Sequence, residues 1–146
     1  MIIYTMGFAQ KNAETFFELI KKHEIELLID IRLNNKSQLA GFTKGQDLKY
    51  FLKKICACSY DHCVEFAPTK EILDAYKGNQ ISWQQYVEQF IPLMEKRKAI
   101  EIFDKKYKGF NAICFLCSEP TPEQCHRRLL AEMICNQHTN ISIKHI

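Results

Sequence analysis

Continuous apolar runs constrain the fold of this chain more than any other feature. Residues 26–31 read ELLIDI, residues 112–116 read AICFL, and a third apolar run at residues 2–5 stops at Gly7. Runs of this kind suit strands that are covered on both faces, as the strands of a parallel sheet are. These three runs therefore predict buried strands in a layered domain.

Segments with helical periodicity separate the predicted strands. Behind Asn12, which can cap a helix, apolar residues recur at i, i+3, i+4 and i+7. Another helix is expected to start at a capping box formed by Ser82 and Gln85, with a kink or a break at Pro92. Three more helices are expected to cover residues 48–55, 69–76 and 100–107.

Strands that alternate with helices predict an α/β fold. Further strands at residues 57–64 and 141–146 bring the number to about five. We therefore expect a single three-layer domain over residues 1–146, with a mainly parallel sheet and helices on both faces. A chain of 146 residues is long enough to bury a core in one such domain.

Composition and charge fit an ordinary globular protein. Hydrophobic residues make up 47% of the chain, and the formal net charge is +3. This charge permits a phosphate-bearing partner but does not argue for one, because no dense Lys/Arg block accompanies it. No apolar run approaches the roughly 20 residues of a membrane helix, so no membrane partner is expected.

The seven cysteines are an odd number, and the N-terminal sequence MIIYTMGF lacks the basic region and cleavage site of a signal peptide. We therefore expect reduced thiols and a cytoplasmic protein. A secreted domain held together by disulfides is the alternative. The sequence does not determine the oligomeric state.

The side chains that most often act in catalysis or metal binding, Cys, His, Arg and Glu, are concentrated in residues 111–135. This stretch predicts a buried strand, a short polar loop and a helix, with Thr121 as the N-cap and Gln124 in a capping box. Residues 125–127 (Cys-His-Arg) then occupy the fourth to sixth helical positions. Because the apolar face of this helix is centred near His126, that side chain is expected to point toward the sheet.

Residues 125–127 have two interpretations. Cys125, near a helix N-terminus and beside His126 and Arg127, has the surroundings of a nucleophilic or redox thiol. Alternatively, Cys125 is a small buried hydrophobe, and His126 is a core histidine bonded to a backbone carbonyl or to Glu119.

A metal site is a further interpretation of the same residues. Cys117, Cys125 and His126, with His62 as a fourth candidate, supply the mixed thiolate and imidazole ligands that zinc accepts. Cys114 is a weak candidate, because residues three apart on a strand point to opposite faces. No metal is assigned from the sequence, and the cofactor stays unknown.

Polar residues also follow the second predicted strand. Asp30 and Arg32 project to the same side, and Lys36 and Ser37 in the loop beyond would suit an anion. In open parallel sheets, ligands bind beyond the carboxyl ends of the strands, often against a helix N-terminus. Because residues 117–119 end another predicted strand, we expect a polar pocket at this edge.

These motifs resemble the family known as domain of unknown function 488. Its most specific element is Cys117-x-Glu119 followed by Cys125-His126-Arg127. Three further elements match at strand ends: Thr5-Met6-Gly7-Phe8, Leu28-Ile29-Asp30-Ile31-Arg32 with a downstream Ser37, and Tyr60 with His62. Asn35 replaces a usual Pro, and Phe66-Ala67-Pro68 replaces a Leu-Gly-Gly or Leu-Gly-Pro turn. The resemblance implies a compact α/β domain with its polar motif residues at one edge, and no established activity.

Three functions are compatible with these residues. The first is a small enzyme acting on an anionic, phosphate-bearing substrate, with Cys125, His126 and Glu119 as its catalytic residues. The second is a nucleic-acid or nucleotide binding module without catalysis, and the third is a buried polar network that only holds the loops. The residues expected to bind a substrate are Asp30, Arg32, Ser37, Tyr60, His62 and Arg127.

Overall fold

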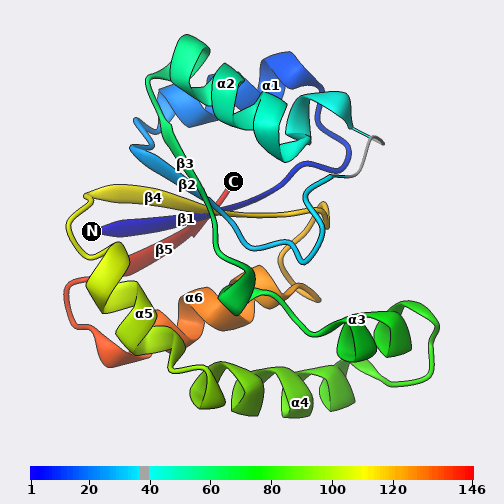
Figure 1. Ribbon diagram of the computed structural model, residues 1–146. Coiled ribbons are helices and arrows are strands. Elements are labelled where there is room, and N and C mark those ends of the chain that lie inside the picture. Colours follow the sequence, from blue (N-terminus) through cyan, green and yellow to red (C-terminus); the bar gives the residue numbers. More distant parts are fainter. Residues whose placement is uncertain (37–39) are drawn as a thin grey trace.

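The computed structural model describes residues 1–36 and 40–146, and Figure 1 shows a central sheet with helices on both sides. Its strands are β1 (Ile2–Gly7), β2 (Leu27–Asp30), β3 (Ser59–His62), β4 (Ala112–Cys117) and β5 (Ser142–His145). Its α-helices are α1 (Ala13–Lys22), α2 (Gly45–Cys56), α3 (Lys70–Lys77), α4 (Trp83–Lys96), α5 (Ala99–Lys106) and α6 (His126–Gln137).

The strands form one sheet in the order β3-β2-β4-β1-β5. Every pairing is parallel, with β4 between β1 and β2 and with β3 and β5 at the two edges. The three apolar runs form the three central strands, whereas the edge strands are more polar and more exposed. The prediction of a three-layer α/β domain with a parallel sheet of about five strands is confirmed.

Each face of the sheet has its own core. α1 and α2 cover one face over a core that includes Phe16 and Cys114. α4, α5 and α6 cover the other face over a core that includes Phe90 and Phe115. Since alternate residues of a strand face opposite sides, Cys117 turns to the same face as Phe115, away from Cys114.

Local capping follows the predictions in α1 and α4. Asn12 Oδ1 accepts a hydrogen bond of 2.8 Å from a backbone N–H in the first turn of α1. Ser82 and Gln85 form the predicted capping box of α4. We expected a kink or a break at Pro92, and the helix does not break there, since α4 continues to Lys96. Pro92 is exposed, so water can bond the carbonyl oxygen that lacks a helical partner.

The helices α3 and α4 form an arm on the side of the sheet where α6 lies. Figure 1 shows α3 near the carboxyl ends of the strands, beyond the edge of the sheet itself. This arm supplies a wall for the cavity described next. In the part of the chain that the structure describes, none of the helices is long and apolar enough to cross a membrane.

Candidate functional site

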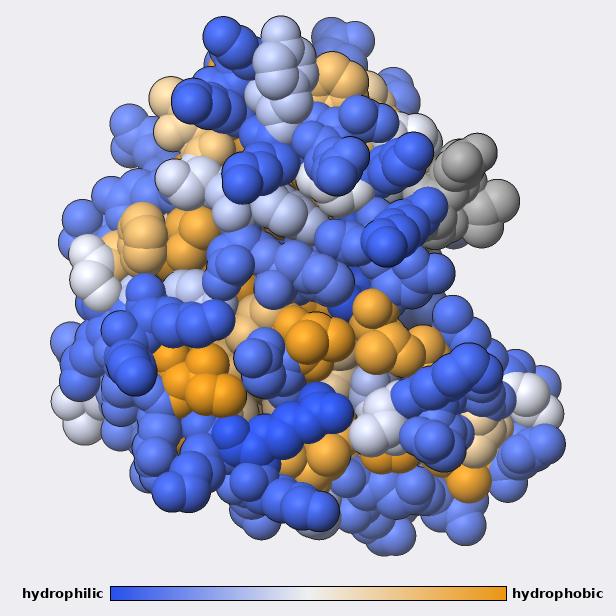
Figure 2. Space-filling view, in the orientation of Figure 1, coloured by the Kyte–Doolittle hydropathy of each residue, from blue (hydrophilic) through white to orange (hydrophobic). Residues whose placement is uncertain are grey.

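A cavity of about 340 Å³ opens at the carboxyl ends of the central strands. Phe8 after β1, Arg32 after β2 and Cys117 at the end of β4 line it, together with residues of α3, of α4 and of the loop before α6. The space-filling view shows the surface hollowed between the α1–α2 layer and the α3 arm, with hydrophobic residues in the hollow (Figure 2). A cavity therefore lies at the edge of the sheet where the sequence predicted a pocket.

The helix that carries the motif begins later than predicted. α6 starts at His126 with Cys125 as its N-cap, so the prediction of a helix capped by Thr121 is wrong. Gln124 closes no capping box, because its Oε1 accepts a hydrogen bond of 2.8 Å from Tyr76 Oη. His126 therefore occupies the first helical position, beside the end of β4, rather than the fifth.

His126 is held between two segments that are distant in sequence. Its Nε2 lies 2.9 Å from the backbone carbonyl oxygen of Ile31, and its Nδ1 lies 3.7 Å from Sγ of Cys117. Because a carbonyl oxygen only accepts, Nε2 carries a hydrogen and Nδ1 faces the thiol. The prediction that His126 points toward the sheet is confirmed, and its partners are a carbonyl oxygen and a thiol rather than the Glu119 carboxylate.

The surroundings of Cys117 favour its thiolate. A hydrogen bond from the Cys125 thiol, the charge of His126 and the backbone N–H of Glu119 lower the pKa of Cys117 well below its ordinary value, against the opposing effect of burial. The bond to Cys117, together with burial, raises the pKa of Cys125. Burial opposes the charged imidazole, but contact with Cys117 raises the pKa of His126. Because Cys117 is the thiol that contacts Nδ1 of His126, the geometry favours Cys117 as the reactive thiol, in place of Cys125.

The backbone of Glu119 connects the loop to α6. Its carbonyl oxygen accepts a hydrogen bond of 2.7 Å from Nη1 of Arg127. Arg127 is only 1% exposed, and it is not among the residues that line the cavity. Arg127 therefore holds the loop in place, whereas the Glu119 side chain borders the cavity.

Asp30 and Arg32 form a buried ion pair rather than an open binding site. Nε and Nη2 of Arg32 lie 2.8 Å and 2.6 Å from the two carboxylate oxygens of Asp30. Nη2 also donates to the carbonyl oxygen of Thr43, and Tyr60 Oη donates to Asp30 at 2.7 Å. His62 Nε2 donates to the carbonyl oxygen of Arg32 at 2.7 Å. These bonds join the end of β2 to β3 and to the loop before α2.

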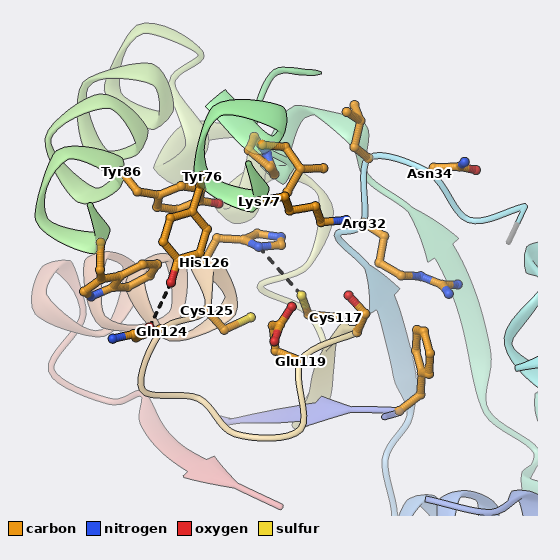
Figure 3. A pocket seen from close by; sticks show the side chains of 16 residues that line it. Arg32, Asn34, Tyr76, Lys77, Tyr86, Cys117, Glu119, Gln124, Cys125 and His126 are labelled. Atoms are coloured by element: carbon orange, nitrogen blue, oxygen red, sulfur yellow. Dashed lines mark hydrogen bonds between the residues drawn. The ribbon is translucent and has the colours of Figure 1, made fainter. Parts of the chain in front are cut away.

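Some of the predicted site residues line the cavity, and others do not. Figure 3 shows the guanidinium group of Arg32 directed away from Cys117 and His126. Ser37, which the sequence also suggested, lies outside the described residues. Of the other predicted residues, Arg32, Cys117, Glu119, Cys125 and His126 line the cavity, whereas Asp30, Tyr60, His62 and Arg127 do not.

Sequence reasoning missed the aromatic wall of the cavity. Phe8, Tyr76, Trp83 and Tyr86 line it, and the rings of Trp83 and Tyr86 stack with their centroids 5.0 Å apart. Lys77 from α3 lines it as well. Aromatic residues at helical spacing indicate a buried face of α4, and this signal does not distinguish a packed core from a cavity wall.

Cys117, Cys125 and His126 have the arrangement of a possible metal site. Their three ligand atoms lie within 4.8 Å of one another, and all three residues are buried. Two thiolates and an imidazole suit zinc, and a hydrogen bond from the second imidazole nitrogen to a carbonyl commonly supports a ligating histidine. His62 does not belong to this cluster, because its Nε2 donates to the Arg32 carbonyl oxygen.

Comparison with known proteins identifies the family and leaves the activity open. No curated protein and no solved structure shows a significant match to the chain. The family model described as "Domain of unknown function DUF488" matches residues 12–134, a segment that holds the Asp30–Arg32 pair and the whole of residues 117–127. The chain therefore belongs to the DUF488 family of domains of unknown function.

Proposed function

We propose that this protein is an enzyme in which Cys117 is the nucleophile and His126 transfers protons. The contact of 3.7 Å between Sγ of Cys117 and Nδ1 of His126, at the wall of a cavity, carries the proposal. A cysteine becomes a strong nucleophile when an adjacent imidazole takes the thiol proton. The hydrogen bond from Nε2 to the Ile31 carbonyl oxygen supports this role, because it keeps Nδ1 directed at the sulfur atom.

Each neighbour of the pair has a part in the proposed reaction. The thiol proton of Cys117 moves to Nδ1 of His126, and the backbone N–H of Glu119 and the thiol of Cys125 stabilise the resulting thiolate. The N-terminus of α6 adds a positive potential beside the sulfur atom. The thiolate then attacks an electrophilic atom of the substrate, and the imidazolium returns a proton to the leaving group. The Glu119 carboxylate would contact the substrate rather than His126.

The cavity favours a small organic substrate with an anionic group. A volume of about 340 Å³ falls in the range of small-molecule sites. Lys77 is exposed and lines the cavity, so it can meet an anionic group of the substrate, whereas the charge of Arg32 is already paired with Asp30. Lys77 therefore supports the anionic substrate suggested by the sequence. Nucleotide or nucleic-acid binding without catalysis has less support, because Arg127 lies outside the cavity and Arg32 donates to Asp30 and Thr43.

The structural hypothesis fits the polar residues around the Asp30–Arg32 ion pair. Asp30, Arg32 and Tyr60 bond one another and hold the backbone around Thr43, so we assign them to support of the cavity rather than to chemistry. All seven cysteines are free. Free thiols in this number favour a reducing compartment such as the cytoplasm, which we propose as the location.

Alkylation of the reduced protein at pH 7 tests the proposal. Iodoacetamide is added in the presence of a metal chelator, and the modified cysteines are identified by peptide mass spectrometry. We expect Cys117 to react roughly tenfold faster than a free cysteine. Burial raises the pKa of Cys63 to about 11 and that of Cys58 to about 12, so both should stay unmodified.

The role of the imidazole is tested by two matched variants. His126→Gln should slow the alkylation of Cys117 by roughly tenfold, because the proton acceptor is lost. His138→Gln is the control, since His138 is a largely buried histidine at the C-cap of α6 that bonds Asp104 at 2.7 Å. Preferential alkylation of Cys125, or equal rates in His126→Gln and the wild type, would contradict the proposed mechanism.

A further inference from the structure

We infer that Cys117 and Cys125 form a redox-active dithiol that reduces small organic disulfides, with Cys125 as the resolving thiol. The inference rests on the proposed nucleophilic role of Cys117, and it names a reaction and a substrate class for the same cavity. The starting observation is Cys125, a thiol that nucleophilic catalysis by Cys117 does not require. Cys125 is 2% exposed, borders the cavity and lies beside the nucleophile.

The two thiols face each other across the start of α6. Their sulfur atoms lie within 4.8 Å of each other. Figure 3 shows both sulfur atoms pointing into the space between the end of β4 and α6. A disulfide needs the two sulfur atoms about 2 Å apart, so a modest side-chain movement is required.

The backbone at Cys125 permits this movement. Cys125 is the N-cap of α6 and has extended dihedrals, with φ −138° and ψ 137°. Its side chain is therefore free of the clash with a preceding helical turn that limits χ1 inside a helix. Cys117 is the last residue of β4, where the chain leaves the sheet. Neither residue lies in the middle of a regular element.

The remaining cysteines are placed elsewhere. Cys114 lies in the core under α1 and α2, on the opposite face of the sheet. The thiols of the others contact groups outside the cavity: Cys56 bonds the Phe17 carbonyl, Cys58 the Ser59 carbonyl, Cys63 the Glu65 carboxylate and Cys135 the Ile141 carbonyl. Cys125 is therefore the thiol placed to attack a disulfide on Cys117.

The proposed reaction balances without a cofactor. The thiolate of Cys117 attacks one sulfur atom of R–S–S–R, the S–S bond breaks, and R–S⁻ leaves and takes a proton from His126. Cys125 then passes its proton to His126 and attacks Sγ of Cys117, which expels the second R–S⁻. That thiolate takes up the proton from His126. The dithiol loses two electrons and two protons, and the substrate, which is the oxidant, becomes two R–SH molecules.

The cavity fits an organic disulfide better than a smaller oxidant. Its volume of about 340 Å³ far exceeds what a peroxide needs, and its aromatic wall offers apolar surface to the groups that flank an S–S bond. Lys77 is exposed and lines the cavity, so it can meet a carboxylate on such a group. An aromatic disulfide with carboxylates is accordingly a suitable probe.

The test uses 5,5′-dithiobis(2-nitrobenzoate) at one molar equivalent, at pH 7 and with a metal chelator. The starting protein is the full chain with Cys56→Ser and Cys135→Ser, because these two are the cysteines that are not fully buried. We expect release of both halves of the reagent and a peptide map that joins Cys117 to Cys125. In the same protein with Cys125→Ser, we expect release of one half, with the other half bound to Cys117.

Each other outcome overturns a stated part of the reasoning. If the starting protein keeps half of the reagent on Cys117, the resolving role of Cys125 is refuted and the nucleophilic role of Cys117 stands. If Cys117 is not modified at all, the proposed function itself fails. A disulfide from Cys117 to another cysteine, or to a second chain, also refutes the inference. The peptide map of the starting protein decides the matter even if the Cys125→Ser variant does not fold.

Discussion

Replacing Gly7 with alanine should destabilise the protein and impair the Cys117 thiol at the same time. Gly7 pairs with Cys117 where β1 and β4 end, and the loop that follows β4 passes closely over it. A Cβ atom at position 7 would lie 1.6 Å from the carbonyl oxygen of Glu119 and 3.0 Å from Nη1 of Arg127. The first contact is with backbone, so no side-chain rotation can relieve it.

The size of this clash sets the expected effect. The carbonyl oxygen of Glu119 has to move from 1.6 Å to beyond 3.0 Å, a displacement of at least about 1.4 Å. That movement breaks its bond with Arg127 and shifts the N–H that supports the Cys117 thiolate. Overpacking of this severity costs about 3 kcal/mol. At about 2–4 °C per kcal/mol for a chain of this size, Tm should fall by about 6–12 °C.

Thermal unfolding followed by circular dichroism and iodoacetamide labelling of Cys117 check the two effects. Gly109→Ala is the matched control, because no atom beyond its two neighbours in the chain lies within 4 Å of the added Cβ. The control should keep the wild-type Tm and labelling rate. A Gly7→Ala variant that unfolds at the wild-type temperature would refute the steric reasoning. A lowered Tm with an unchanged labelling rate would show that the Glu119 backbone does not influence the thiol.

Three further predictions concern stability. Arg32→Leu leaves the buried Asp30 carboxylate without its partner and should cost about 3–5 kcal/mol. Tyr60→Phe removes one hydrogen bond to the same carboxylate and should cost roughly 1.5–3 kcal/mol. Urea unfolding measures both variants, and an equal loss of unfolding free energy in Arg32→Leu and Tyr60→Phe would argue against a buried ion pair. The Cys117–His126 pair predicts a pH dependence, because the pKa of Cys117 is lowered and that of His126 is raised in the folded protein. Unfolded His and Cys titrate near pH 6.5 and 8.5, so the pair should stabilise the fold fully between about pH 6.5 and 8.5. The contribution of the pair falls at lower pH as Cys117 takes up a proton, and it falls at higher pH as His126 loses one. The measurement is the difference in unfolding free energy between the wild type and Cys117→Ser. A difference that stays constant with pH would contradict this prediction.

Much of the fold followed from local patterns. The runs at residues 26–31 and 112–116 predicted buried strands, because a strand covered on both faces cannot tolerate polar alternation. They form β2 and β4 at the centre of the sheet. Capping by Asn12 and by the Ser82–Gln85 box depends on residues within one turn, and both were predicted correctly. The cluster of Cys117, Cys125 and His126 was also predicted, since its members lie near one another in sequence.

The start of α6 shows why local patterns fail at the site. The residues around Thr121 have the form of a helix N-terminus, yet Gln124 bonds Tyr76, which is 48 residues away in the sequence. Gln124 thus makes a tertiary hydrogen bond in place of the expected local capping bond. The helix begins at His126, and that side chain reaches the Ile31 carbonyl, 95 residues away in the sequence.

The sequence by itself determined that this is a parallel α/β domain with its Cys, His and Arg motif near the carboxyl ends of the strands. Only the tertiary structure decided that Cys117 contacts the imidazole, that Asp30 and Arg32 bond each other, and that aromatic residues of α3 and α4 close the cavity. The physical reason is the range of the interactions. Strand burial and capping are set by neighbours in the chain, whereas the pKa of a thiol and the shape of a cavity depend on groups that meet only after folding.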